Sequence, residues 1–312
     1  MNNTPTFHIN RSRLLSDALT ARGWQAAAPD AVADFAMWSS QEGGPREARW
    51  RLLDNDLAWQ LDDKRLMHDT LTVSGTPDFA PPTFTTLPAY LEYLRVSGSA
   101  CFCFLKTTHG TAAEGVFLCN GVGELIRQLK AVEGNAGTYV IQQGVRDVQL
   151  IRGRKFKIRA FVLLLSDWSA WVYRESLVVL HEKPYNPDST DRDVHISPPD
   201  REGVERLSEQ AFEPAIRDQL GEVAAKSIDC LREKNRTPDI QNRYQLFGYD
   251  LIMDRDGRLN LIEINAFPNL SRVDDTGLAV MRELMGDLAD FVSETTAGKV
   301  PLQPTGFVRA TA

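Results

Sequence analysis

The sequence is poor in cysteine and histidine and has no long apolar segment. Its 312 residues include four cysteines and five histidines. None of the cysteines has the C-x-x-C spacing of a zinc or redox site, so we expect buried free thiols. The longest aliphatic and aromatic run near the middle of the chain, Phe161 to Leu165, is far too short to span a bilayer. The first fifteen residues lack the apolar core that a secretory signal requires, and a cytoplasmic protein is therefore predicted.

An excess of positive charge is also missing. The net charge of −7 argues against a nucleic-acid-binding protein, which normally carries a basic face. No G-x-x-x-x-G-K-[ST] sequence occurs, which excludes a P-loop nucleotide site. The remaining composition, 43% hydrophobic and 25% charged, is typical of a globular protein that can form two or three lobes.

The segment from Gln245 to Pro268 has the pattern of a hydrophobic hairpin. Two strand-like runs, Leu246–Met253 and Arg258–Ile264, flank the turn-forming sequence Asp-Arg-Asp-Gly. If the loop is even, Met253 faces Arg258, and this register decides which side chains meet across the hairpin.

Three oxygen-bearing side chains then lie on one face of that hairpin. In the even register Asp250 lies opposite Leu261, and Glu263 is its diagonal neighbour, roughly 7–8 Å away. Strand alternation places Asp250, Glu263 and Asn265 on the same face. Carboxylate and amide oxygens suit Mg²⁺ or Mn²⁺ bound together with phosphate. The alternative is an edge hairpin whose acids face water.

A second strand carries positive charges. In the segment 150–165, alternation places Lys155, Lys157 and Arg159 on one face. Three cations on one face repel one another unless an anion lies between them. An exposed edge strand protected by lysine is the alternative. Because the segment continues into the apolar run 161–165, we expect a central strand.

A glycine-containing loop joins two further predicted strands. The strand Ala100–Lys106 ends in a lysine, the loop Thr107–Gly115 follows, and Val116–Cys119 forms the second strand. Such a loop can fold over a triphosphate and present backbone N–H groups, while Lys106 supplies a positive charge. A hairpin loop that binds no ligand is the alternative.

The hairpin sequence FGYDLIMDRDGRLNLIEINAFP resembles the signature of the tubulin–tyrosine-ligase-like branch of the ATP-grasp superfamily. The resemblance implies an α/β (α+β) ATP-grasp fold, with ATP held between two lobes and a small N-terminal α/β lobe. It also implies that Asp250, Glu263 and Asn265 hold the magnesium ion of MgATP.

Other motifs extend the resemblance from about residue 63 to residue 268. RKFKIR is similar to the family's R-K-F-[DK]-I-R motif, in which Lys155 and Arg159 match, while Lys157 stands where tyrosine ligases tend to have aspartate. The loop after Lys106 is similar to the family's phosphate loop. The resemblance implies cofactor-binding roles for Lys106, Lys155 and Lys157 and for the loop glycines Gly110 and Gly115.

The strand Tyr139–Gln143 and the residues after it resemble the hinge between the two ATP-binding lobes. In the family the backbone of this passage contacts adenine, which implies cofactor contacts at Gln142, Gln143 and Val145. Tyrosine ligases often have a lysine where this chain has Gln143. Adenine recognition by backbone atoms survives that change, but a direct lysine contact does not.

Three residues complete the set of candidates. Arg174 in VYRES resembles the family arginine that accompanies a phosphate or acyl phosphate; alternatively it pairs with Glu175 or Glu182. The sequence Asp63-Lys64 resembles an Asp-Lys pair of ATP-grasp ligases, so Lys64 is a candidate substrate contact, and a solvated surface pair is the alternative. His195 lies in a segment similar to H-[IL]-[ST]-N, although Pro198 replaces the expected asparagine.

The chain is divided into four predicted parts: residues 1–72, an N-terminal lobe; 73–143, a central lobe with the lysine and phosphate loop; 144–296, a C-terminal lobe with the hairpin; and 297–312, a loose tail. Helices are predicted over 11–22, 89–96, 121–132 and 275–293. One or two more are predicted over 204–233, broken near Pro214 and Gly221.

Together these features predict an ATP-dependent ligase that joins a carboxylate to an amine through an acyl phosphate. Arg159 and Arg174 are the candidate catalytic residues, because they would offset charge on the transferring phosphoryl group. A nucleotide-binding module without turnover and an ATP-grasp phosphotransferase are the alternatives. The acid and the amine, each a small molecule or a peptide, and the oligomeric state are left open.

Overall fold

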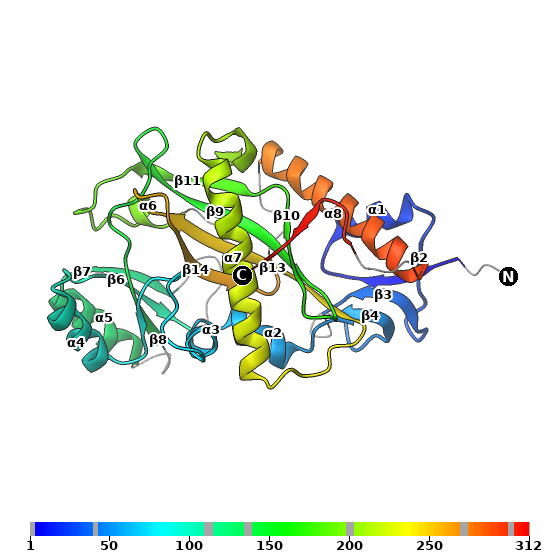
Figure 1. The fold of residues 1–312 in the computed structure, drawn as a ribbon, viewed down its shortest axis with the longest axis horizontal. Coiled ribbons are helices and arrows are strands. Elements are labelled where there is room, and N and C mark those ends of the chain that lie inside the picture. Colours follow the sequence, from blue (N-terminus) through cyan, green and yellow to red (C-terminus); the bar gives the residue numbers. More distant parts are fainter. Residues whose placement is uncertain are drawn as a thin grey trace.

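The computed structural model describes residues 4–39, 43–108, 115–133, 139–197, 203–268, 274–298 and 303–311 (Figure 1). Its strands form two sheets, and its helices lie around them. The predicted mixed α/β class is confirmed. The large sheet includes strands from both ends of the chain. The predicted division into lobes stays a prediction. Among the described residues no helix has the length and apolarity to cross a membrane.

The larger sheet has eleven strands, with the order β12-β11-β9-β13-β4-β3-β1-β2, and β10, β14 and β15 pair beside this path. The strand bounds are β1 Thr6–Ile9, β2 Gln25–Ala26, β3 Ala33–Met37, β4 Ala48–Leu52, β9 Arg154–Leu164, β10 Ala170–Tyr173, β11 Leu177–Pro184, β12 Val204–Arg206, β13 Arg243–Met253, β14 Leu259–Asn265 and β15 Phe307–Arg309. The N-terminal strands pair in parallel and join the rest through β4 and β13.

The smaller sheet has the order β5-β8-β6-β7, and all its pairs are antiparallel. Its strands are β5 Thr83–Phe84, β6 Phe102–Thr107, β7 Val116–Asn120 and β8 Tyr139–Gln143. Helices α4 (Leu87–Ser97) and α5 (Val122–Glu133) pack on one face, around the buried Tyr90 and Leu125. Cys103 and Cys119 are buried there as free thiols, as predicted, while Cys101 and Cys230 are partly exposed.

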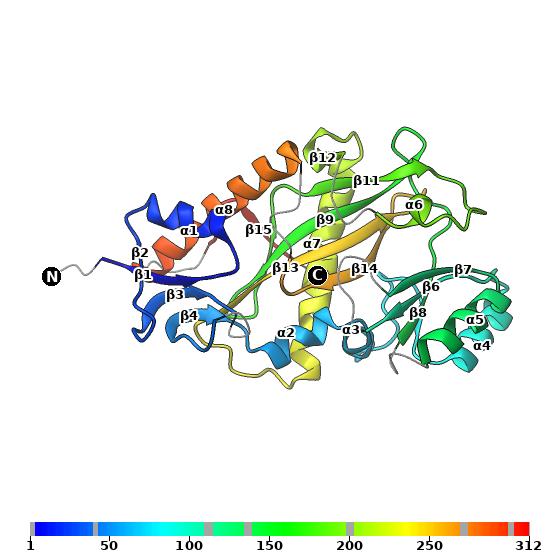
Figure 2. The same cartoon turned by 180° about the vertical axis from the view of Figure 1, so that it is seen from behind.

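The remaining helices cover the larger sheet (Figure 1, Figure 2). They are α1 Arg13–Thr20, α2 Asn55–Asp62, α3 Lys64–Leu71, α6 Arg192–His195, α7 Glu213–Lys234 and α8 Asp275–Thr296, together with a 3₁₀ helix at Leu207–Glu209. Helix α1 begins after Ser12, whose side chain accepts a hydrogen bond from the Leu15 N–H and so satisfies one of the free donors of the first turn. Both α1 and α8 line the same hydrophobic core.

Strand β9 is central, as predicted. It lies between β11 and β13, and its two faces enter different cores. Phe156, Ile158 and Val162 pack with residues of α7, whereas Phe161 and Leu163 pack with residues of α1 and α8. Lys155, Lys157 and Arg159 therefore occupy the polar end of a strand that is otherwise buried on both sides.

Two predictions about the C-terminal part were wrong. Helix α7 runs unbroken over 22 residues, because Pro214 lies in its first turn, where no backbone N–H partner is lost. Gly221 stays within the helix, close to the backbone of Ala310. Residues 307–309 are not loose: they form β15, which pairs with β10 from Trp171 to Tyr173.

Candidate functional site

Asp250 and Glu263 are directly opposite each other across β13 and β14. The predicted diagonal arrangement was wrong for two reasons. The turn pairs Met253 with Leu259, one residue later than expected, and a β-bulge between Asp250 and Leu251 shifts the register once more. A bulge opposes two residues to one, so Asp250 and Glu263 face each other directly. An even hairpin would have placed them as diagonal neighbours.

Arg159 holds Asp250 from the neighbouring strand. The two residues are paired in register across β9 and β13. Arg159 Nε and Nη2 donate to the two carboxylate oxygens at 2.5 and 2.8 Å, and Lys157 Nζ donates to Oδ2 at 3.1 Å. Burial alone would lower the pKa of Arg159, but the charge and hydrogen bonds of Asp250 outweigh it and raise that pKa. The arginine therefore stays charged in a buried position.

Gly248 makes this arrangement possible. A Cβ atom at that position would lie 2.9 Å from Pro268 Cβ and 3.3 Å from Arg159 Cδ and Nη1. Any side chain here would push Arg159 away from Asp250 or displace Pro268. The glycine of the hairpin motif therefore serves close packing between β9, β13 and the end of β14.

Lys106 and Gln142 present polar groups from the smaller sheet. Lys106 is buried on β6, and its Nζ donates to Gln142 Oε1 at 2.7 Å. Gln142 Nε2 donates to the carbonyl of Ile262 on β14 at 3.5 Å. Burial lowers the pKa of Lys106 to about 8, and the negative charge of Glu263 opposes that shift. These two side chains therefore connect the smaller sheet to the acidic hairpin.

Lys155 is fully buried at the start of β9, and among the described residues its Nζ has no hydrogen-bond partner. The Nζ lies 5.4 Å from the centre of the Phe104 ring. Burial, with a smaller contribution from the charge of Lys106, lowers the pKa of Lys155 to about 7. A buried amine without an acceptor is costly unless a ligand supplies one.

The predicted adenine contacts lie where β8 ends. The Gln143 side chain points to the helical side of the smaller sheet and accepts from the Tyr90 hydroxyl at 2.8 Å. The backbone N–H groups of Gln143 and Gly144 already donate to the carbonyls of Pro82 and Phe102. Val145, the third residue predicted to contact adenine, directly follows Gly144 in the segment after β8. An adenine contact in this passage therefore cannot use the N–H of Gln143 or Gly144 as they stand.

The two predicted loop glycines differ in what the structure says of them. Gly110 lies outside the described residues. Gly115 has a φ of +69°, and a Cβ there would clash with the side chain of Thr107, so this position favours glycine.

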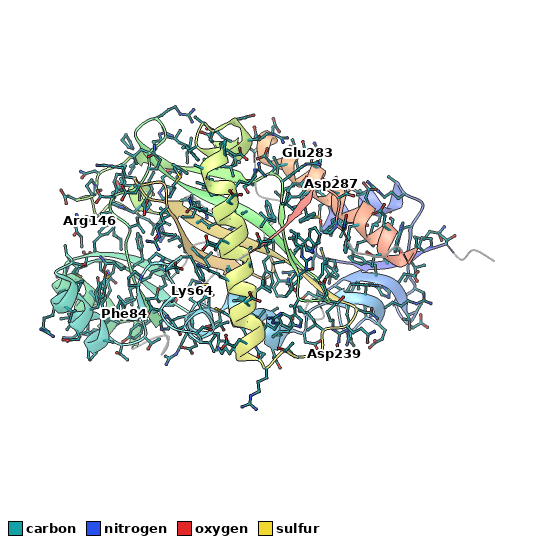
Figure 3. All side chains as sticks on the ribbon, viewed as in Figure 1. Lys64, Phe84, Arg146, Asp239, Glu283 and Asp287 are labelled. Carbon is teal, nitrogen blue, oxygen red and sulfur yellow. The ribbon has the colours of Figure 1, made fainter. Side chains whose placement is uncertain are left out.

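The junction between α2 and α3 meets the end of β14. Asp63 caps α3 by accepting hydrogen bonds from the N–H groups of Arg65 and Leu66. The next residue, Lys64, is buried. Asp62 Oδ1 accepts the Ala266 N–H at 2.6 Å. Burial raises the pKa of Asp62, with the Ala266 hydrogen bond opposing and Glu263 adding to the shift. Figure 3 shows Lys64 in the middle part of the molecule.

Asp62 is the residue that sequence reasoning missed. An acid at the end of a short amphipathic helix looks like any solvated surface residue. Only the tertiary fold brings it beside Glu263.

His195 lies on α6, buried against Phe102 and Tyr185. Its Nε2 lies 2.9 Å from the Ser189 carbonyl oxygen. Burial and the charge of Lys155 lower the pKa of His195 to about 4, so the ring is neutral at pH 7. His195 therefore packs as a neutral ring and adds no charge near Lys155.

Arg174 forms an ion pair with helix α8. Its Nη2 pairs with Asp287 Oδ2 on α8 at 2.9 Å, and its side chain is half exposed. Figure 3 shows Asp287 and Glu283 far from Arg146 and Phe84 along the long axis of the molecule. The alternative interpretation predicted an ion pair with Glu175 or Glu182; among the described residues the ion pair is with Asp287. A catalytic role for Arg174 stays a prediction.

The donor set around Glu263 fits a hard divalent cation. Among the residues that the structure describes, no three His, Cys, Asp or Glu side chains gather as a metal cluster. The predicted ligands are instead two opposed carboxylates and an amide. Asn265 Nδ2 donates to the Gly248 carbonyl at 3.3 Å, which leaves Oδ1 as the acceptor atom. Such oxygen ligands suit Mg²⁺ that also binds phosphate oxygens.

Comparison with known proteins identifies one family. The model of the tubulin-tyrosine ligase family matches residues 55–199 and 202–299. A probable tubulin polyglutamylase of Caenorhabditis elegans is 23% identical over 248 residues, covering 68% of this chain and 58% of that protein. A human tubulin monoglycylase is 24% identical over 223 residues, with 59% and 28% covered.

A third relative, a probable tubulin–tyrosine ligase of Schizosaccharomyces pombe, is 26% identical over 157 residues, which cover 46% of this chain and 39% of that protein. The matched part of this chain therefore spans 58% or less of the length of each of these relatives.

Proposed function

The chain belongs to the tubulin-tyrosine ligase family, which has an ATP-grasp-like fold, and we propose that it is an ATP-dependent ligase that joins a carboxylate to an amine. One observation carries the proposal: Asp250 and Glu263 are opposed on one face of a hairpin, with Arg159 fixed beside them. Lys106 from the smaller sheet acts electrostatically on the same two carboxylates. Cations and acids from two sheets thus meet where a metal-bound triphosphate would lie.

Lys106 and Lys155 would bind the phosphates of ATP. Both are buried, and Lys155 has no acceptor among the described residues, so phosphate oxygens would satisfy it. Gln142 and Val145 would lie near adenine, as would Gln143. Asp250, Glu263 and Asn265 would hold Mg²⁺, or Mn²⁺, which supplies charge neutralisation at the phosphates when bound.

The reaction would proceed in two displacements. An oxygen of the substrate carboxylate attacks the γ-phosphorus of ATP, and the bond to the bridging oxygen breaks, giving an acyl phosphate and ADP. The nitrogen of the amine then attacks the acyl carbon. Phosphate leaves with the electron pair of the C–O bond, and the nitrogen loses a proton. Arg159 would stabilise the charge on the transferring phosphoryl group, and Arg174 would do so only if it leaves Asp287.

The substrates belong to the proposal as well. The relatives are named for adding amino acids to tubulin, so we propose a peptide or protein acid and an amino-acid amine, in the cytoplasm. Tubulin itself is one candidate acid.

Hydroxylamine trapping tests this function. With MgATP, the acid substrate and hydroxylamine, a ligase yields the hydroxamate of that acid and one ADP for each hydroxamate. A screen of acidic peptides with each amino acid, read as ADP release, would find the pair. MgATP binding without ADP release or hydroxamate in any combination would contradict the proposal.

A nucleotide-binding module without turnover is the second candidate. The ion pair of Lys157 with Asp250 favours it, because a cation there competes with a metal for the carboxylate. Trapping separates the two candidates, since the module would bind MgATP and give no hydroxamate.

A further inference from the structure

Three cysteines lie together on one face of the smaller sheet. Cys103 on β6 pairs in register with Cys119 on β7, and residues directly opposite each other in an antiparallel pair have Cα atoms about 4.5–5.5 Å apart. Cys101 precedes Cys103 by two residues. All three pack with Tyr90 in the core between the sheet and helices α4 and α5 (Figure 1). Oxidation can join thiols that are this close, and the proposed ligase reaction uses none of them.

Cys103 is the central thiol of this cluster. It hydrogen-bonds with the Cys101 thiol and with the Cys119 thiol, and its side chain is fully buried. Those hydrogen bonds, burial and the charge of the Cys101 thiolate all raise the pKa of Cys103, so it stays protonated at pH 7. Oxidation of Cys101 removes that charge, and Cys103 is then the thiol best placed to react next.

Cys101 has the properties of a reactive thiol. It is partly exposed, whereas Cys103 and Cys119 are buried. Hydrogen bonds stabilise its thiolate, chiefly the one from Cys103 and also one from the Gly121 N–H directly before helix α5. They outweigh burial and the charge of Glu124 and lower the pKa of Cys101 to about 6. A partly exposed thiolate of lowered pKa is the form of cysteine that peroxides oxidise.

Phe102 connects the first two cysteines to the predicted adenine contacts. It lies between them in the chain, and its carbonyl accepts the Gly144 N–H at 2.7 Å. The Gln143 side chain donates to the carbonyl of Ala100, which precedes the pair, at 3.3 Å. The segment that follows β8 is therefore held by the same short stretch of backbone that carries the two cysteines.

A disulfide between Cys101 and Cys103 would move that stretch. Residues two apart in an extended strand have Cα atoms about 6.6 Å apart, and a disulfide spans about 4.4–6.8 Å, most often about 5.5–6 Å. The bond can therefore close, and closing it draws the two Cα atoms together. The carbonyl of Phe102 turns with them and weakens its hydrogen bond from Gly144. Oxidation thus reaches the segment after β8 without touching the proposed metal ligands.

We propose that Cys101 and Cys103 form a redox switch: hydrogen peroxide oxidises Cys101, Cys103 closes a disulfide with it, and the altered segment after β8 binds MgATP less tightly. The Cys101 sulfur attacks a peroxide oxygen, the O–O bond breaks, and a sulfenic acid and, with the thiol proton, water form. The Cys103 sulfur then attacks the Cys101 sulfur, the S–O bond breaks, and the oxygen leaves as water with the Cys103 proton. Only the choice of MgATP as the affected ligand rests on the proposed function.

Differential alkylation and peptide mass spectrometry of the whole chain test the thiol chemistry. After mild peroxide treatment Cys101 and Cys103 resist alkylation, and dithiothreitol restores their reactivity. Cys230 is the matched control, because it is also partly exposed but burial raises its pKa; it stays open to alkylation at the same peroxide concentration. Cys103→Ala leaves the sulfenic acid of Cys101 uncaptured, so dimedone labels it, and a melting curve checks the fold. Cys119→Ala retains the disulfide.

Calorimetry with MgATP tests the switch. The oxidised chain should bind about fivefold or more weakly than the reduced chain, which is the lower end of typical coupling between two sites, and dithiothreitol should restore the affinity. Cys101→Ser, at a partly exposed position, should bind like the reduced chain before and after peroxide treatment. Because oxidation of methionines affects that variant equally, the variant isolates the effect of the disulfide.

Each failure has a separate meaning. If Cys101 is no more reactive than Cys230, or if the disulfide joins Cys103 to Cys119 instead, the proposed reactive pair is wrong and the ligase proposal stands. If the disulfide forms and the affinity for MgATP is unchanged, the cysteines are not a switch. If the reduced chain does not bind MgATP, the proposed function fails and the switch with it, while alkylation still decides whether the two thiols react.

Discussion

Arg159 and Asp250 form a two-point contact across paired positions of β9 and β13, with both side chains at least nine-tenths buried. A guanidinium and a carboxylate match in shape, so the contact fixes both groups in one orientation. The same contact determines which way Asp250 faces, and therefore how it meets Glu263. The chemistry of the hairpin depends on a strand about ninety residues earlier in the chain.

Removing Arg159 should destabilise the fold. Arg159→Met takes the two-point partner away from the buried Asp250 carboxylate, and breaking a buried pair costs about 3–5 kcal/mol. Urea unfolding measures the change. Arg95→Met, which breaks a surface pair with Glu92, should cost much less. Equal losses of unfolding free energy in the two variants would show that the Arg159 contact stabilises the fold no more than a surface ion pair does.

Glu263→Gln should stop turnover without unfolding the chain. Glu263 is partly exposed at the hairpin, and the amide keeps its shape while the charge that would hold Mg²⁺ is lost. ADP release should fall by about 100-fold or more, with an unchanged melting temperature. Glu222→Gln, on the exposed side of α7, should behave like the unchanged chain. Near-normal turnover in Glu263→Gln would refute the metal assignment.

MgATP binding should take up protons above pH 7. The pKa values of Lys155 and Lys106 are lowered to about 7 and about 8 by burial. Between pH 7.5 and 8.5 a fraction of both amines is neutral, and phosphate oxygens favour the charged form. Affinity should therefore decline as pH rises through this window. Calorimetry in buffers of different ionisation enthalpy measures the uptake, and Lys155→Met should reduce it.

Acid should destabilise the protein partly through His195. Its folded pKa, lowered to about 4, lies below the unfolded value near 6.5. Between these values the unfolded chain binds more protons, so this contribution is present above about pH 6.5 and is lost as pH falls toward 4. The slope is up to about 1.4 kcal/mol per pH unit. Urea unfolding at pH 4.5, 5.5 and 7 should show a smaller slope for His195→Gln.

Asp62 should matter more as an acceptor than as a charge. Asp62→Ala leaves the Ala266 N–H without its partner, which costs about 1–3 kcal/mol. Asp62→Asn keeps an oxygen for that N–H and removes a charge next to Glu263, so it should cost clearly less. Thermal unfolding compares the two. If the asparagine variant is the less stable one, the negative charge is the feature that holds the end of β14.

Strand alternation was enough to predict much of the site. It places Asp250, Glu263 and Asn265 on one face, and an apolar continuation identifies β9 as a central strand, because both properties depend only on local order along the chain. The motif residues around them led to the family that the comparison then established. The metal and nucleotide roles of these residues stay predictions.

Register, docking and long-range contacts were beyond such reasoning. The bulge that sets Asp250 opposite Glu263 exists only when two strands pair, and Asp62 becomes part of the site only when α2 meets the end of β14. The tail forms a strand because β10 offers it an edge. By itself the amino-acid order determined which residues share a face, since the period of a strand is local. Which faces meet was decided by the tertiary structure, because packing between distant segments sets the distances.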